Sequence, residues 1–69
     1  MGMIRLRLHT VTGGVFDDDV RGVVIEDGIM QIERAGGWVD TIDATRLQAV
    51  FVDDRRLTRD DLIQYEKKG

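Results

Sequence analysis

Cysteine is absent from this sequence of 69 residues, and histidine occurs once, as His9. Without cysteine the chain has no disulfide and no thiolate zinc site, and a single histidine removes most of the remaining metal chemistry. A chain of this length buries only about 60% of the surface that it exposes when unfolded, so its stability is marginal without a covalent or metal cross-link. We therefore expect tight packing or self-association to stabilise the fold.

The sequence also lacks any apolar run near the roughly 18 residues that a membrane span requires, and it does not start with a basic and then apolar signal segment. The simplest expectation for its location is cytoplasmic. Residues 1–2 precede a second methionine, Met3, and are expected to be an added extension before the native start. Lysine is scarce beside arginine, two against eight, which suggests the GC-rich genome of a bacterium or its phage.

The composition is that of a folded chain, with 42% hydrophobic and 33% charged residues of both signs. The formal net charge of -3 disfavours general nucleic-acid binding, because such domains usually have an excess of basic residues. We expect one β-rich domain over residues 1–69.

Alternation of apolar and polar residues predicts the first strand, in which Ile4, Leu6 and Leu8 lie on one face and Arg5, Arg7 and His9 on the other. Further runs rich in β-branched residues predict four more strands. The five expected strands span residues 3–11, 20–26, 29–34, 38–43 and 47–52. The runs at 23–25 and 49–52 are apolar on both faces, which predicts cover on both sides of the sheet.

Turn signals separate these runs. Asp27-Gly28 predicts a two-residue hairpin with positive φ at Gly28. The run Asp17-Asp18-Asp19 is expected to be a turn that leads into the strand at 20–26, and residues 43–46 are expected to form one tight or 3₁₀ turn.

A short α-helix is expected over residues 58–68. Thr58 can cap its first turn, acidic residues follow at Asp60 and Asp61, and Lys67 and Lys68 suit its C-terminal end. This helix is expected to dock on the second apolar face of the sheet.

These elements predict a mainly β fold with one C-terminal α-helix, arranged as a small antiparallel five-stranded meander or a partly closed barrel. The segment 41–47, with a strand, a turn and a strand, resembles the SH3-like and Sm-like barrels, and this resemblance implies such a layout. Val15-Phe16-Asp17, followed by Val20, Val23 and Val24, is similar in spacing to the N-terminal β-sandwich of the ATP synthase epsilon subunit, up to Gly28. We transfer no function from either resemblance.

No catalytic set can be assembled from the sequence. His9 has no cysteine or serine nucleophile to activate, and the adjacent Asp53 and Asp54 would point to opposite faces of a strand. The Asp17–Asp19 run lacks the spacing of a calcium loop. The Gly-Gly pairs at 13–14 and 36–37 lack the strand, loop and helix order of a phosphate site. We expect no enzyme activity, no metal and no small-molecule cofactor.

Two kinds of binding surface remain open. Trp38, Val24 and Val50 are candidates for contact with a protein partner, although the indole of Trp38 is also suited to capping the core. Alternatively, Arg5, Arg7 and His9 could follow a phosphate backbone while an aromatic such as Trp38 stacks on a base. The leading hypothesis is a non-enzymatic interaction module of a bacterium or phage that binds another protein or itself. The alternative is a nucleic-acid-binding regulatory protein, and no membrane partner is expected.

Overall fold

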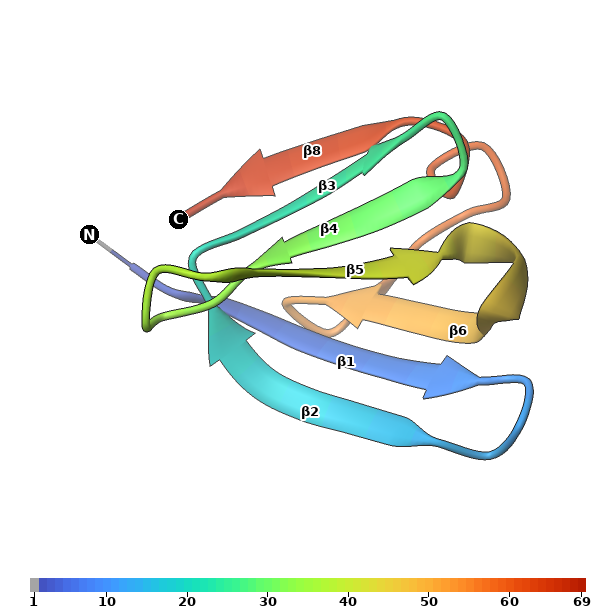
Figure 1. The fold of residues 1–69 in the computed structure, drawn as a ribbon, viewed down its shortest axis with the longest axis horizontal. Helices are drawn as coiled ribbons and strands as arrows, with labels where there is room; N and C mark the ends of the chain where they lie inside the picture. Colours follow the sequence, from blue (N-terminus) through green and yellow to red (C-terminus); the bar gives the residue numbers. More distant parts are fainter. Residues whose placement is uncertain (1) are drawn as a thin grey trace.

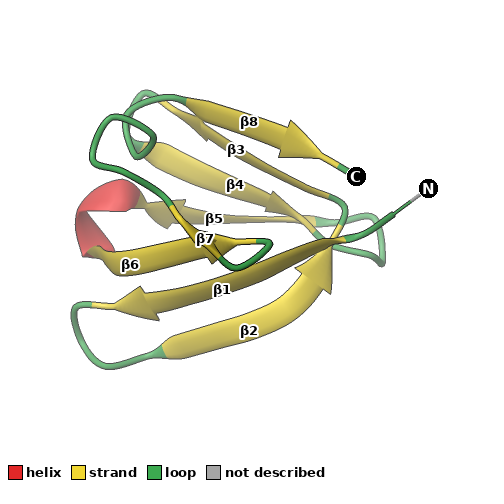
Figure 2. Cartoon of the chain, turned by 180° about the vertical axis from the view of Figure 1, so that it is seen from behind, coloured by secondary structure: helices red, strands yellow, loops and turns green. Residues whose placement is uncertain are grey.

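Two antiparallel four-stranded sheets make up the computed structural model, which describes residues 2–69 (Figures 1 and 2). Sheet A has the order β2-β1-β6-β7 and sheet B the order β5-β4-β3-β8. The strands are β1 (Ile4–Thr10), β2 (Val15–Val20), β3 (Gly22–Glu26), β4 (Ile29–Glu33), β5 (Val39–Asp43), β6 (Leu47–Val52), β7 (Arg55–Arg56) and β8 (Tyr65–Lys68). The single 3₁₀ helix of the described residues, η1 (Ala44–Arg46), connects β5 to β6. Met1 of the predicted extension lies outside the described residues.

The core lies between the two sheets and is formed by the alternate residues that the strand periodicity predicts. In β1, Ile4, Leu6 and Leu8 are buried and the residues between them are exposed. The other buried apolar residues are Val20, Val23, Ile25, Met30, Ile32, Leu47, Val50, Val52 and Leu57. Because both sheets contribute residues to this core, each sheet has one face buried against the other.

The predicted meander through β3, β4 and β5 is confirmed. Asp27 and Gly28 form the two-residue hairpin loop, with φ values of 53° and 77°, between the paired residues Glu26 and Ile29. The predicted 3₁₀ turn is also confirmed, because Asp43 caps η1 by accepting a hydrogen bond from the backbone N–H of Thr45. β6 has the predicted bounds.

A bulge in β6 explains why its pattern is not a plain alternation. His9 pairs with Ala49 and Thr10 pairs with Leu47, so Gln48 is an extra residue in the ladder. The shift allows Leu47 and Val50 to face the same core although they are three residues apart.

The prediction of five strands in one sheet was wrong, and one reason is β2. Asp17, Asp18 and Asp19, expected to form a turn, instead continue a strand from Val15 to Val20. β2 is an edge strand, so its carboxylates remain in solvent, and they form ion pairs with Arg5 and Arg34. After β2 the chain crosses at Arg21 from sheet A to sheet B.

The predicted C-terminal α-helix at 58–68 was also wrong. Thr58 does cap a turn, since its hydroxyl accepts from the N–H of Asp61 at 3.2 Å and the Asp61 carboxylate accepts from the N–H of Thr58 at 2.9 Å. One hydrogen-bonded turn follows and ends at Gln64. A single turn has little stability of its own, whereas residues 65–68 gain a full ladder with β3 and become β8.

The predicted helix was expected to cover the outer face of the strands with apolar residues on both faces, which are β3 and β6. Among the described residues no helix does so. Instead, neighbouring side chains on the same face cover them. The guanidinium of Arg7 lies over the ring of Phe51 at 4.7 Å from its centroid. Val24 lies between Gln31 on β4 and Glu66 on β8.

Within residues 2–69 we find no helix with the length and apolar character needed to cross a membrane.

Candidate functional site at the open side of the sandwich

The two lateral sides of the sandwich differ in how well they are closed. On the side of β7 and β8, Leu57 is buried and Leu62 and Tyr65 pack against the core. An ion pair of 2.8 Å between Lys67 of β8 and Asp53 of the β6–β7 turn joins the sheets on that side. On the other side, β2 and β5 end their sheets, and no further strand of the described residues covers them. We call this second side the open side.

A groove of about 280 Å³ runs along the open side between the two edge strands. Its floor is apolar and consists of Leu8, Phe16, Ile32 and Ile42, while Val15 and Asp40 lie on its rim. Phe16 and Ile42 are only partly buried although both pack against the core. The groove is therefore an uncovered part of the space between the sheets.

Arg34 connects the two edges of the open side. Its guanidinium lies 2.8 Å from Asp40 of β5, 3.6 Å from Asp18 of β2 and 5.0 Å from the centroid of the Phe16 ring. The side chain is 27% exposed, so these contacts are partly screened from water. Arg34 thus holds β2 and β5 beside each other without covering the groove.

The two edges differ in how their backbones are protected. In β2, the Asp18 carboxylate accepts a hydrogen bond of 2.8 Å from the N–H of Asp19, which occupies one backbone donor of that strand. Among the described residues, no side chain forms a hydrogen bond with the backbone of Val39, Asp40, Thr41 or Ile42. An unprotected edge strand is a template for pairing with another strand. β5 is accordingly the less protected of the two edges.

Trp38 lies just before β5 and is 60% exposed, so its indole is in contact with water more than with the core that one interpretation of the sequence expects it to cap. The ring packs on Gly36, where any β-carbon would clash with it. Val39, the next residue, is 54% exposed. Neither residue lines the groove, because Val39 pairs with Glu33 and so lies on the outer face of sheet B; the two form a separate exposed apolar pair at the start of the edge strand.

The other predicted partner-binding residues do not join Trp38. Val24 is partly buried on the outer face of β3. Val50 is 1% exposed and belongs to the core of the chain itself. The structure therefore places these residues in three different surroundings, and only Trp38 lies near the groove strand β5.

Arg5, Arg7 and His9 do share the outer face of sheet A, as their alternation predicts. Arg5 lies 2.9 Å from Asp17 and 3.6 Å from Asp19. The hydrogen bond and charge of Asp17 raise the pKa of Arg5. Acidic neighbours compensate its charge, which makes this face less suitable for phosphate than the sequence alone suggests.

Two aspartates, Asp43 and Asp53, make structural contacts that shift their pKa. Hydrogen bonds from Thr45 lower the pKa of Asp43. The hydrogen bond with Lys67, followed by the one from the N–H of Arg5, lowers the pKa of Asp53. Across residues 2–69 there is no group of three or more His, Cys, Asp or Glu side chains placed to hold a metal ion.

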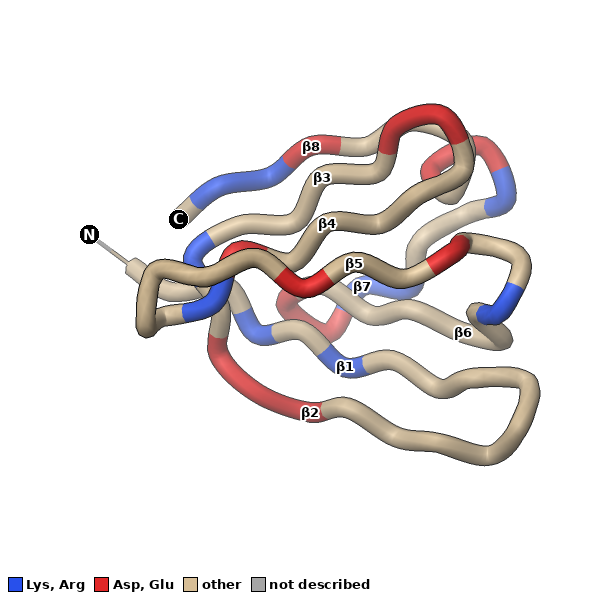
Figure 3. Tube along the Cα trace, in the orientation of Figure 1, with Lys and Arg blue, Asp and Glu red and all other residues tan. Residues whose placement is uncertain are grey.

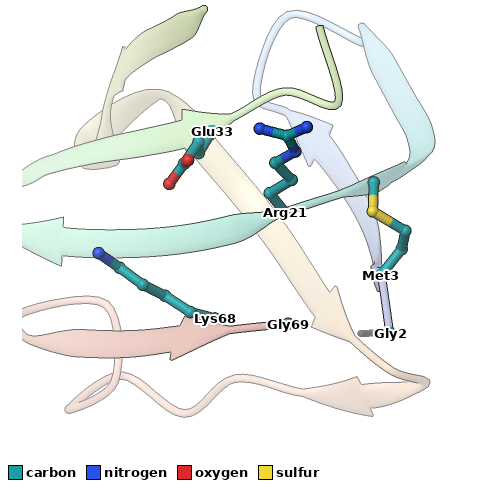
Figure 4. Close-up of a pocket in the computed structure, with 6 residues that line it drawn as sticks. All are labelled: Gly2, Met3, Arg21, Glu33, Lys68 and Gly69. Atoms are coloured by element: carbon teal, nitrogen blue, oxygen red, sulfur yellow. The ribbon is translucent and has the colours of Figure 1, made fainter. Parts of the chain in front are cut away.

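A second cavity, of about 480 Å³, lies beside the two ends of the chain (Figure 4). It is lined by Gly2, Met3, Arg21, Glu33, Lys68 and Gly69. Glu33 and Lys68 flank Gly22 across the outer face of sheet B. Arg21 and Lys68 form no salt bridge with another described residue.

Sequence reasoning misses the groove because it misses β2. Phe16 and Asp18 share the inner face of an edge strand. That these two side chains point the same way can be inferred only if Asp17–Asp19 is read as part of a strand and not as a turn. Arg34 falls at the end of a predicted strand, where the sequence indicates no role for it.

Comparison of the chain with protein-family models, with curated proteins and with solved structures finds no match. A functional proposal must therefore depend on the geometry of the chain itself.

Proposed function

We propose that this domain is a non-enzymatic interaction module that binds protein through its open side. The observation that supports this most directly is the apolar groove between two edge strands, one of which, β5, has an unprotected backbone. An added strand would satisfy the free backbone groups of β5, and its inward side chains would cover Phe16 and Ile42.

Two further observations favour a protein partner. Trp38 and Val39 present large apolar side chains next to the same edge, and aromatic residues are enriched among the energetically dominant residues of protein interfaces. On the basic strand face, in contrast, Asp17 and Asp19 compensate the charge of Arg5, so nucleic acid is the weaker candidate.

The proposal can be tested by site-specific photo-cross-linking. A benzophenone amino acid replaces Val39 on the open side, and the matched control replaces Asp27 at the tip of the β3–β4 hairpin. Irradiation of cells that produce the chain, followed by mass spectrometry, identifies the adduct. We expect a defined protein adduct from position 39 and none from position 27.

A second variant connects the adduct to the groove. Ile42→Lys places a charge on the groove floor and should abolish the adduct, because burying an unpaired ammonium against apolar groups is unfavourable. A melting measurement confirms that the variant remains folded. Equal labelling from both positions, or labelling that persists in Ile42→Lys, would contradict the proposal.

A further inference from the structure

We infer that the protein bound by the open side is a second copy of this chain, and that β8 of that copy pairs with β5 to extend sheet B. This inference rests on the proposed function. It specifies the partner, the strand that docks and the register. Three independent properties of the edges lead to it.

The first property is strand direction. Each sheet has four strands, and every neighbouring pair is antiparallel. The two edge strands of a sheet with an even number of antiparallel strands run in opposite directions. A copy displaced sideways in the same orientation therefore presents β8 antiparallel to β5, which is the direction that an extended antiparallel sheet requires.

The second property is charge. β2 and β5 contain aspartates and no basic residue, whereas β7 and β8 contain Arg55-Arg56 and Lys67-Lys68 with Glu66 as their one carboxylate (Figure 3). On the open side, two arginines face four aspartates. Arg5 forms ion pairs with Asp17 and Asp19, and Arg34 forms ion pairs with Asp18 and Asp40. Negative charge thus remains in excess there.

On the opposite side, Arg55, Arg56 and Lys68 form no salt bridge with another described residue. A sideways displacement brings the acidic edges of one copy to the basic edges of the next. Complementary potentials of this kind guide association and set the register.

The third property is the pattern of side chains along the two strands. Asp40 and Ile42 point to the inner face of sheet B, as do Tyr65 and Lys67 of β8. In one antiparallel register Asp40, which also contacts Arg34, faces Lys67 of the second copy, which also contacts Asp53 of its own chain. Ile42 then faces Tyr65 of the second copy. Both pairs are favourable cross-strand neighbours. Moving β8 by two residues in either direction separates Asp40 from Lys67.

The same charges disfavour a symmetric pair. In a two-fold arrangement of open sides, the strands that meet are β2 and β5, which carry aspartates and no basic residue, so the two edges repel each other. The contact is therefore heterologous, with different surfaces on the two copies, and it repeats from copy to copy.

Charge reversal tests this arrangement on the purified full chain. Asp40→Lys and Lys67→Glu are compared with the wild type and with a control, Glu26→Lys, which changes an exposed carboxylate away from β5. Sedimentation velocity is measured from about 10 μM to about 1 mM protein, at low salt and at about 500 mM NaCl. Melting temperatures show that each variant is folded.

We expect the wild type and Glu26→Lys to gain mass with concentration, and less so at high salt. Each reversal alone should weaken association at least about tenfold, because like charges then meet. An equal mixture of the two reversed variants should recover it, because the lysine introduced in β5 of one variant then faces the glutamate introduced in β8 of the other. Recovery cannot come from a damaged fold, so it identifies the β5–β8 pairing.

Three results would overturn the inference. The wild type is monomeric at every concentration, the mixture of reversed variants does not regain association, or Asp40→Lys weakens association while Lys67→Glu does not. If the chain is monomeric while the cross-linker at position 39 attaches to a different protein, the inference fails and the proposed function stands. If neither association nor a cross-link is observed, both fail.

Discussion

Asp27 and Gly28 both adopt the left-handed conformation that closes the β3–β4 hairpin in two residues. For a residue with a β-carbon this conformation costs about 1–2 kcal/mol. A β-carbon at Gly28 would have no atom within 4 Å, so any cost of substitution there comes from the backbone and not from a clash.

We expect Gly28→Ala to lower the free energy of unfolding by about 1 kcal/mol. Gly22→Ala is the matched control, because Gly22 has no positive φ and its β-carbon would lie 3.2 Å from Cγ of the flexible Lys68 side chain. Because Gly22→Ala imposes no left-handed backbone strain, it should lower stability less than Gly28→Ala does. Urea unfolding measures both variants, and equal losses would contradict the expected backbone strain.

At the scale of single residues, the sequence is informative where a signal depends on adjacent residues. The hairpin at Asp27-Gly28 and the 3₁₀ turn at residues 43–46 are such cases, and both are observed. Trp38 is different, because its exposure depends on which strands lie beyond the Gly36-Gly37 turn. No local pattern contains that information.

At the scale of elements, the segment between β7 and β8 is important because it closes one side of the core. Leu57 is 6% exposed, and its N–H donates a hydrogen bond of 2.9 Å to the carbonyl of Val50. Ile63, later in the same segment, is 65% exposed. Similar apolar residues in one segment thus have opposite surroundings.

Leu57→Ala should therefore lower the free energy of unfolding by about 2–4 kcal/mol, the usual cost of leaving a cavity in a packed core. Ile63→Ala, the comparison within the same segment, should change it by less than about 0.5 kcal/mol. Chemical denaturation of both variants checks this. Similar values for the two would mean that the segment does not close the core.

The same segment shows why the helix prediction fails while its cap is correct. The cap consists of two hydrogen bonds between Thr58 and Asp61, which are three residues apart, so it is a local property. Whether the next residues stay helical depends on the free edge of β3, far away in the sequence. β2 is similar, because Asp18 is stabilised by Arg34, which no local pattern places nearby.

For the whole molecule, Asp53 connects the two sheets. One carboxylate oxygen accepts the N–H of Arg5 in sheet A at 3.0 Å, and the other lies 2.8 Å from Lys67 in sheet B. These contacts lower the pKa of Asp53. A carboxylate whose pKa is lowered by folding stabilises the fold above its unfolded pKa, and this contribution is lost as the pH falls through the folded pKa.

We therefore expect the free energy of unfolding to decrease below about pH 4, near the ordinary pKa of an aspartate, and to decrease less in Asp53→Asn. Asparagine retains an acceptor oxygen and tolerates the φ of 49° at this position. The control is Asp54→Asn, since Asp54 also has positive φ and forms no salt bridge with a described residue. The free energy of unfolding is measured from pH 7 to pH 2.5. Its decrease with falling pH should be the same in the wild type and in Asp54→Asn, and smaller in Asp53→Asn.

The division into two sheets is the part of the fold that local patterns do not contain. The strands from β3 to β6 are predicted with nearly correct bounds, because alternation and turn residues define them locally. A strand followed by a tight connection fits either one curled sheet or two packed sheets. The crossing at Arg21 decides between them, and it depends on the packing of Val20 and Val23 in a common core.

The extra residue at Gln48 also determines where β6 can change in length. Without Gln48, Leu47 and Val50 would lie two residues apart, which is the spacing of one face in a regular strand, so both could still reach the core. Without Phe51, in contrast, Val50 and Val52 would become neighbours, and one of these two buried side chains would turn toward solvent. A loss of one residue is therefore tolerable at the bulge and harmful a few residues later in the same strand.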